Sequence, residues 1–262
     1  MQELERAGSE SPRGEDRRLG EYQALFYPES RLLGFSGVDG TVAFYVAVNA
    51  ALRGDDAVLD VGCGRGARAD DPVEFRRALA TLRGRCRCVL GIDLDPAAAT
   101  NPTLDEFRLI EGRRWPVADE SIDVCIADWV LEHIDEPDAF FAECRRVLRP
   151  GGYLHIRTPN VLSYFGLLSR FIPERRHGAV LRWAQPTRRE EDVFPKYYRC
   201  NTMRTLRTVL DRHGFTHVVR GYEPEPGYLG FSRVAYALGV LYQRLAPSAL
   251  RTNLLVHARK EL

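Results

Sequence analysis

Short apolar and β-branched runs recur along the first 160 residues of the chain. They cover residues 57–61, 88–93, 106–110, 122–127 and 152–157. Runs of this length that end in glycine or a polar residue are typical of strands buried in a parallel sheet. Most of the segments between them have helical spacing, most clearly residues 137–148. Strands that alternate with helices predict β-α-β units and a mostly parallel sheet.

The second part of the chain has a different pattern. Residues 159–200 are rich in arginine, proline and aromatic side chains. We expect them to form a lid over the place where a substrate binds, which is called the acceptor site below. A helix over 202–213 and strands over 216–220 and 254–258 are predicted to follow. Residues 227–250 repeat apolar side chains at helical spacing and predict an amphipathic helix. Such a helix packs on its own domain or lies on a membrane surface, and both interpretations stay open.

Composition narrows the class of protein. The chain has 262 residues, enough for one large α/β domain with a cap, and 45% of them are apolar. Its 37 basic and 36 acidic side chains nearly cancel, which argues against a nucleic-acid partner. Residues 1–20 mix Glu and Arg with Gly, Ser and Pro and predict a disordered lead before a domain over 21–262.

No apolar signal core or membrane span is apparent, so we expect a cytoplasmic protein, with peripheral membrane contact left open.

The six cysteines are scattered along the chain without paired C-x-x-C motifs. This spacing gives zinc little support and favours free thiols in a reducing compartment.

The strongest chemical signal is the run Val58-Leu59-Asp60-Val61-Gly62-Cys63-Gly64-Arg65-Gly66, in which a strand enters a glycine-rich turn. Such a loop also fits a dinucleotide-binding fingerprint, so the loop alone does not identify the cofactor. Two nearby carboxylates bear on the choice. Asp60 would repel a pyrophosphate and favour the sulfonium and ammonium of S-adenosylmethionine. Asp93 ends the next strand and can accept hydrogen bonds from ribose hydroxyls of either cofactor. The methyl donor is therefore favoured over a nicotinamide cofactor.

This run resembles motif I of the class I S-adenosylmethionine-dependent methyltransferases, of the methyltransferase type 11 kind. The resemblance covers about residues 55–160 and continues in the same order through later motifs. These are Gly91-Ile92-Asp93-Leu94-Asp95, residues 115–123, Val130-Leu131-Glu132-His133, residues 146–152 and Thr158-Pro159-Asn160. It implies a Rossmann-like α/β fold with a seven-stranded, mostly parallel sheet, helices on both faces and an antiparallel final strand.

The resemblance also implies which residues bind the cofactor. Asp60 and the loop of Gly62, Cys63, Gly64 and Gly66 would hold the methionine end. Asp93 and Leu94 would contact the ribose side, and Glu111 and Gly112 the adenine, although relatives usually carry Asp where this chain has Glu111. Asp128 and Trp129 fall where the methionine end and the acceptor meet.

His133 is the candidate catalytic base, because histidine titrates near neutral pH, and the alternative is a structural hydrogen-bonding role. Some ubiquinone-pathway relatives bind a metal with two glutamates and a histidine in this segment. Trp129 occupies one of those positions here, so no metal is expected. Asp128-Trp129-Val130-Leu131 also differs from the Asn/Asp-Pro-Pro-aromatic tetrapeptide of the DNA and glutamine N-methylating branches.

These observations favour an enzyme that methylates a small molecule, a glycan or a lipid-linked intermediate, with oxygen preferred as the acceptor atom. Two alternatives remain. One is a non-catalytic S-adenosylmethionine-binding regulatory protein, and the other is an NAD(P)-dependent oxidoreductase.

Overall fold

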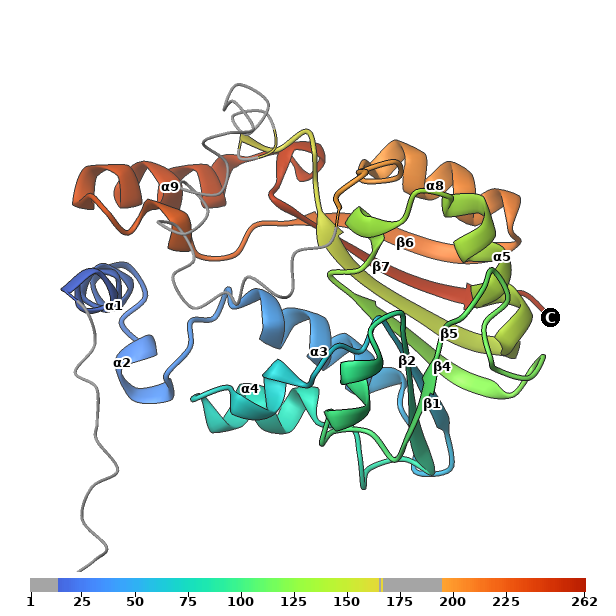
Figure 1. Cartoon of the computed structure of the whole chain (residues 1–262). Coiled ribbons are helices and arrows are strands. Elements are labelled where there is room, and N and C mark those ends of the chain that lie inside the picture. The colour runs from blue at the N-terminus through green and yellow to red at the C-terminus, as the bar shows by residue number, and fades with distance from the viewer. Residues whose placement is uncertain (1–13, 165, 167–194) are drawn as a thin grey trace, which may run out of the picture. The chain divides into compact units, whose positions relative to one another are not determined.

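The computed structural model describes residues 14–164, 166 and 195–262, and Figure 1 lays out their elements. The chain divides into two compact units. The smaller comprises Met1–Gly37 with Glu225–Leu245, and the larger comprises Val38–Pro224 with Ala246–Leu262, as far as these residues are described.

A seven-stranded sheet forms the larger unit. Its strands are β1 (Ala57–Val61), β2 (Cys88–Asp93), β3 (Glu106–Leu109), β4 (Ile122–Asp128), β5 (Leu148–Pro159), β6 (Phe215–Tyr222) and β7 (Asn253–Lys260). The strand order is β3-β2-β1-β4-β5-β7-β6. The first five strands pair in parallel, while β7 runs antiparallel to both β5 and β6. The predicted seven-stranded sheet with an antiparallel final strand is confirmed.

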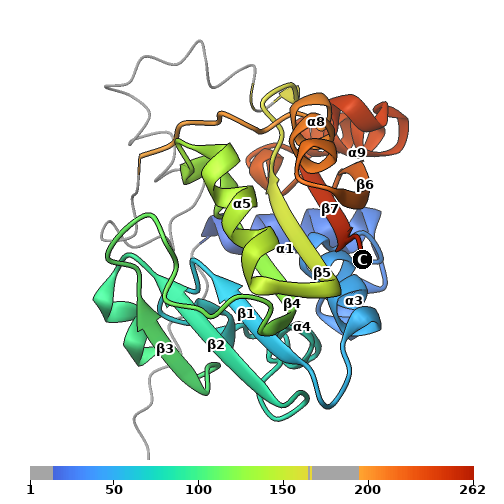
Figure 2. The ribbon, with the colours of Figure 1, turned by 90° about the vertical axis from the view of Figure 1, so that its right-hand side faces the viewer.

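Helices cover both faces of this sheet. One face carries α5 (Pro137–Val147) and α8 (Met203–Arg212), and the other carries α3 (Gly40–Ala51) and α4 (Glu74–Ala80). Figure 2 views the sheet with α5 toward the reader. Because side chains alternate along a strand, Leu59 and Val61 join the cluster under α5, whereas Val58 joins the cluster under α3.

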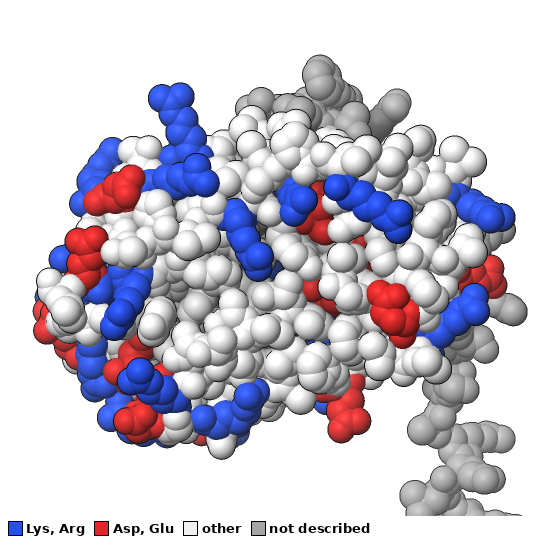
Figure 3. Space-filling model, turned by 180° about the vertical axis from the view of Figure 1, so that it is seen from behind, with Lys and Arg blue, Asp and Glu red and all other residues white. Residues whose placement is uncertain are grey.

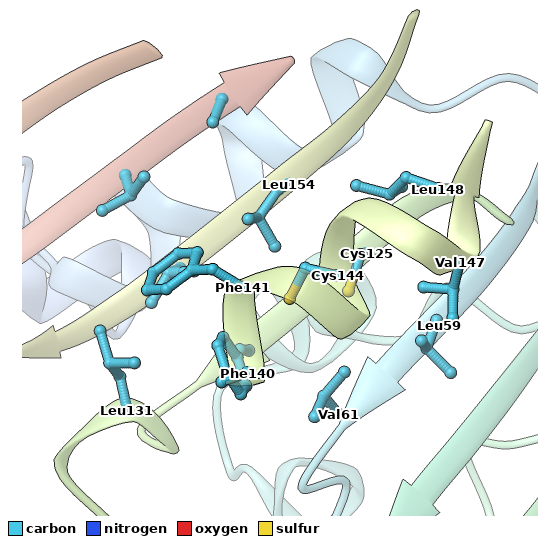
Figure 4. Close-up of a cluster of buried hydrophobic side chains, with 14 of the residues drawn as sticks. Leu59, Val61, Cys125, Leu131, Phe140, Phe141, Cys144, Val147, Leu148 and Leu154 are labelled. Carbon is cyan, nitrogen blue, oxygen red and sulfur yellow. The ribbon is translucent and has the colours of Figure 1, made fainter. Parts of the chain in front are cut away.

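Figure 4 shows side chains of the buried apolar cluster around α5. Phe141 of α5 is fully buried and lies with Leu131 and Leu154. Cys125 of β4 and Cys144 of α5 lie in the same cluster with no exposed surface, and all six cysteines of the chain are free thiols. Burial raises the pKa of the Cys144 thiol, so this residue acts as a small apolar side chain.

Short 3₁₀ turns and capped helices connect the strands. The turns in the larger unit are η1 (Ala67–Asp70), η2 (Pro96–Thr100), η3 (Leu131–His133) and η6 (Ser248–Leu250). Asp39 caps α3 by accepting hydrogen bonds from the backbone N–H groups of Thr41 and Val42, at 2.8 and 2.9 Å. Thr202 caps α8 in a reciprocal arrangement with Thr205.

The smaller unit contains α1 (Gly14–Phe26), α2 (Ser30–Leu33), η5 (Gly227–Leu229) and α9 (Arg233–Leu245). Tyr236 of α9 is fully buried, with its ring 6.0 Å from that of Tyr22 and 5.6 Å from that of Phe26. Residues 14–20, the end of the predicted disordered lead over 1–20, form the first turns of α1. Residues 1–13 lie outside the described part of the chain.

Helix α9 is shorter than the predicted amphipathic helix over 227–250. Its buried side holds Tyr236, Gly239 and Val240. On its other side, Val234, Leu238, Leu241 and Leu245 are 70, 62, 53 and 70% exposed. Within the described ranges, no helix is both long and apolar enough to cross a membrane.

The predicted lid over 159–200 lies mostly outside the described residues. Strand β5 ends at Pro159, and the description resumes at residue 195. Elsewhere on the surface, basic and acidic side chains are interspersed over the face that Figure 3 shows. This mixture agrees with the near-zero net charge of +1.

Candidate cofactor and acceptor site

The predicted site residues meet at one edge of the sheet. Strand β1 leads into the loop Gly62–Gly66, β2 ends at Asp93 and β4 ends at Asp128. Because β1, β2 and β4 are parallel neighbours, their carboxyl ends open on the same side. The carboxyl edge of a parallel sheet is where folds of this kind bind ligands.

The glycine loop is held so tightly that two of its positions exclude a side chain. Gly62 has φ +64°, and a Cβ there would lie 2.6 Å from Cγ2 of Val130. Gly66 has φ +81°, and a Cβ there would lie 2.4 Å from Oδ1 of Asn101. Asn101 also fixes the loop, since its Nδ2 donates to the carbonyl oxygens of Cys63 and Gly64 at 3.0 and 3.1 Å. The backbone of the loop is therefore pre-shaped for close approach of a ligand.

Asp93 joins the glycine loop to the next strand. Its Oδ2 accepts a hydrogen bond from the backbone N–H of Gly64 at 2.9 Å, and its Oδ1 accepts one from the N–H of Asp95 at 2.9 Å. Each carboxylate oxygen keeps a further lone pair, so ribose hydroxyls can still be accepted there.

The predicted adenine-side residues lie next to Asp93. The backbone N–H of Ile110 donates to the Asp93 carbonyl at 2.8 Å, which brings the chain after β3 to this edge. Glu111 and Gly112 follow and are exposed. Leu94 is 66% exposed and offers an apolar surface of the kind that an aromatic base would cover.

Asp60 has an unusual electrostatic position. No hydrogen bond or ion pair to its carboxylate is present among the described residues. Burial, reinforced by the negative charge of Asp128, raises the pKa of Asp60 from 3.8 to about 7. The cavity beside it, lined also by Tyr45 and Ile126, holds about 20 Å³, which is room for about one water molecule.

The carboxylate of Asp128, in contrast, accepts hydrogen bonds from three neighbouring side chains. Arg157 binds it in a bidentate manner, with Nε to Oδ1 at 2.6 Å and Nη2 to Oδ2 at 2.9 Å. Arg68 Nη2 and the Tyr45 hydroxyl, at 3.2 Å, also donate to Oδ2. Burial alone would raise the pKa of Asp128, but the charges of Arg157 and Arg68 hold it below its usual value. The side chain of Asp128 thus joins α3, η1 and β5 through Tyr45, Arg68 and Arg157.

Trp129 has a backbone conformation that non-glycine residues rarely adopt, with φ +63°. Its N–H donates to the carbonyl of Arg157 at 2.9 Å, and the Arg157 guanidinium lies 5.2 Å from the Trp129 ring centroid. The Phe44 ring lies at the same distance from that guanidinium. A left-handed tryptophan costs about 1–3 kcal/mol and is found where the surrounding structure fixes it, often at functional sites.

His133 lies in η3, just after the end of β4. Its Nδ1 is 2.8 Å from the carbonyl oxygen of Pro195. Because a carbonyl oxygen can only accept, Nδ1 carries the proton, and Nε2 is the basic nitrogen of the neutral ring. The neighbouring Glu132 is buried and accepts from the Thr158 hydroxyl at 3.1 Å, and its backbone carbonyl accepts from the N–H of Tyr197 at 2.8 Å. Glu132 is thus tied into the fold, whereas the His133 tautomer leaves Nε2 as the nitrogen without a proton.

Comparison with known proteins identifies the fold and its family. Residues 59–156 match the family model described as a methyltransferase domain. This segment contains the glycine loop, the carboxylates of Asp60, Asp93 and Asp128, and His133. Residues 59–156 form a class I S-adenosylmethionine-dependent methyltransferase domain.

Curated proteins are similar to part of this chain. A probable S-adenosylmethionine-dependent methyltransferase of Mycolicibacterium smegmatis is 34% identical over 112 residues, covering 41% of this chain and 39% of that protein. A ubiquinone biosynthesis O-methyltransferase of Rhizobium leguminosarum is 29% identical over 126 residues, covering 48% of each. The chain therefore spans less than half the length of these two relatives.

Solved structures agree with the observed fold of the methyltransferase domain. An S-adenosylmethionine-dependent methyltransferase from Mesorhizobium loti aligns with a TM-score of 0.53 at 20% identity, over 86% of this chain and 100% of that one. The [4+2]-cyclase SpnF aligns with a TM-score of 0.50 at 18% identity, over 84 and 81% of the two chains. The same fold thus hosts different reactions.

S-adenosylmethionine is the cofactor of this family, and the residues present fit it. The carboxylate of Asp60 lacks a hydrogen-bond partner among the described residues, and open space lies where a Cβ at Gly64 would stand, since no atom lies within 4 Å of that position. In the same part of the chain, no group of three or more His, Cys, Asp or Glu side chains is placed to hold a metal ion. Metal independence stays a prediction.

Sequence reasoning missed three members of the site, namely Arg68, Arg157 and Tyr45. Arg157 left a signal, because it is a charged residue in the strand that neighbours the Asp128 strand. Arg68 and Tyr45 left none.

Proposed function

We propose that this chain binds S-adenosylmethionine and transfers its methyl group to an oxygen atom of a small-molecule, glycan or lipid-linked acceptor. The observation that carries the proposal is the pairing of the glycine loop with Asp60 and Asp93 at neighbouring strand ends. A partly buried carboxylate at the start of the loop suits the cationic methionine end of this cofactor and opposes the pyrophosphate of a nicotinamide dinucleotide.

Oxygen as the acceptor atom is supported by two observations. Several relatives carry the name ubiquinone biosynthesis O-methyltransferase. His133 also has the tautomer that a base needs, since Nδ1 is fixed by the Pro195 carbonyl. A hydroxyl acceptor would transfer its proton to Nε2 of His133 as the new O–C bond forms.

The remaining chemistry is positioning. The bound cofactor supplies a methyl group that its sulfonium already activates. The glycine loop, Asp60 and Asp93 fix the donor, and Trp129 borders the place where the acceptor must lie in line with it. Positioning of this kind can supply most of the rate enhancement.

Calorimetric titration with S-adenosylmethionine, with NADH as the comparison, tests the proposal. We expect saturable binding of the methyl donor that Asp93→Ala weakens at least tenfold, because ribose hydroxyls lose their acceptor. Binding of NADH without binding of the methyl donor would instead support the oxidoreductase alternative.

Turnover is tested separately, by methyl transfer from labelled donor to a panel of phenols, sugars and lipid-linked alcohols. Donor binding without transfer to any acceptor would favour the non-catalytic alternative.

A further inference from the structure

Four charged side chains meet beside the glycine loop, and they divide into two groups. Asp128 and Arg157 form a bidentate pair whose side chains are 6 and 3% exposed, so they neutralise each other within the protein. Arg68 and Asp60 are the other two. With that pair set aside, the Asp128 side of the loop keeps one cation, Arg68, and one anion, Asp60, while Asp93 accepts hydrogen bonds from the backbone N–H groups of Gly64 and Asp95.

Arg68 differs from Arg157 in how it is held. It reaches the same carboxylate through Nη2 alone, and its guanidinium carbon lies 5.3 Å from the Tyr45 ring centroid. Its side chain is 31% exposed, against 3% for Arg157. Arg68 can therefore leave Asp128 without exposing an unpaired charge, because Arg157 stays bound to it.

Asp60 is close to Arg68 but does not bind it. Asp60 lines the same small cavity as Tyr45, over whose ring the Arg68 guanidinium lies, and no hydrogen bond joins the two charged side chains among the described residues. A ligand that carries one positive and one negative group could therefore satisfy both side chains at once. The α-amino-acid end of S-adenosylmethionine has this composition, with an ammonium and a carboxylate on the same carbon.

Resting on the proposed function, we propose that Arg68 recognises the α-carboxylate of S-adenosylmethionine while Asp60 faces the ammonium. On binding, one Nη–H of Arg68 exchanges the Asp128 carboxylate for that of the cofactor. Asp128 keeps its two bonds from Arg157. An arginine fork matches a carboxylate in geometry and charge. The contact would therefore favour the carboxylate-bearing cofactor over an analogue that lacks this group.

The position of Arg68 follows from the local fold. Gly66 has φ +81° and directs the chain into the single turn η1, so that Arg68 lies two residues beyond the loop. The other arginine nearby, Arg65, pairs with Asp95 at 3.1 Å. Arg68 is thus the arginine of the loop that reaches the Asp128 side of the site.

The test compares S-adenosylmethionine with its decarboxylated analogue, which keeps the sulfonium and the amine. Calorimetry on the full wild-type chain near pH 7.5 should give about tenfold or more tighter binding of the carboxylate-bearing form. In Arg68→Met the two affinities should agree within about twofold, through loss of affinity for S-adenosylmethionine. Arg68→Lys should keep part of the preference, because the charge remains and the fork is lost.

Arg83→Met is the matched control, since Arg83 pairs with Asp105 at 2.9 Å and its side chain is 50% exposed. This variant should keep the wild-type ratio of affinities. Equal affinities in the wild type, or a wild-type ratio in folded Arg68→Met, would overturn the assignment. If Arg68→Met does not fold, the wild-type ratio and Arg68→Lys decide. Failure of the wild type to bind either compound would overturn the proposed function itself, so the two failures are distinguishable.

Discussion

Replacing Asp60 by asparagine should make the protein without cofactor more stable at alkaline pH while impairing its function. The carboxylate is partly buried, lies near Asp128 and has no hydrogen-bond donor among the described residues. These surroundings raise its pKa from 3.8 to about 7. Ionisation of Asp60 in the folded state is therefore unfavourable, and asparagine removes that ionisation with little change in shape.

The magnitude follows from the linkage between protonation and folding. The stability that a neutral Asp60 provides is present in full below pH 3.8 and is lost as the pH rises through about 7. At about 1.36 kcal/mol per unit of pKa, the whole effect is about 4 kcal/mol. By the same arithmetic, about 2.5 kcal/mol of it falls between pH 5 and pH 8.

Urea unfolding of the wild type and of Asp60→Asn at pH 5 and pH 8 measures this difference. We expect the advantage of the variant to grow by about 2.5 kcal/mol between the two pH values. Asp55→Asn, in the exposed turn before β1, is the control and should show no such growth. If the difference between wild type and Asp60→Asn stayed constant within about 0.5 kcal/mol, the low-dielectric environment assigned to Asp60 would be wrong.

Three further predictions concern the loop, the base and helix α9. Gly62→Ala should lower donor affinity at least tenfold and lower the melting temperature, because its Cβ would lie 2.6 Å from Val130 at a positive φ. Calorimetry and thermal melts should show partial recovery when Val130→Ala is added, and no recovery would mean that the backbone conformation alone is responsible. His133→Asn should reduce kcat by about 100-fold or more with donor Kd unchanged, whereas an unchanged kcat would leave His133 structural. If α9 contacts anionic membranes, the protein should float with anionic vesicles and Leu238→Glu/Leu241→Glu should not; a wild type that does not float ends that hypothesis.

Most of the sheet could be predicted because its strands are buried on both faces. Continuous apolar runs located β1, β2 and β4 to within one residue. Strand β5 was predicted too short, since it begins at Leu148 and passes through Pro150 and two glycines, which local patterns assign to a turn. The first turns of α1 were missed because their sequence is charged, whereas packing of Tyr22 and Phe26 on Tyr236 holds the helix. That contact joins segments about 200 residues apart and leaves no local trace.

The candidate site also contains residues that the sequence could predict and residues that it could not. Asp60 and Asp93 were predictable because each follows an apolar run, and parallel strands bring their ends together. The partners of Asp128 come from α3, η1 and β5, which no short motif connects. Sequence reasoning therefore located the carboxylates at the strand ends, and it missed the arginines that set the charge around them.

The charges of the site link cofactor binding to stability. Ionised Asp60 destabilises the folded protein, and a cation bound beside it removes part of that penalty. A ligand that binds only the folded state stabilises it according to its affinity. Binding that depends on ionised Asp60 must weaken as the pH falls below about 7. Stabilisation by S-adenosylmethionine should therefore be larger at pH 7.5 than at pH 5.5 in the wild type and nearly equal at both in Asp60→Asn. The raised pKa of Asp60 is thus the property that makes the empty site costly and the cationic ligand favourable.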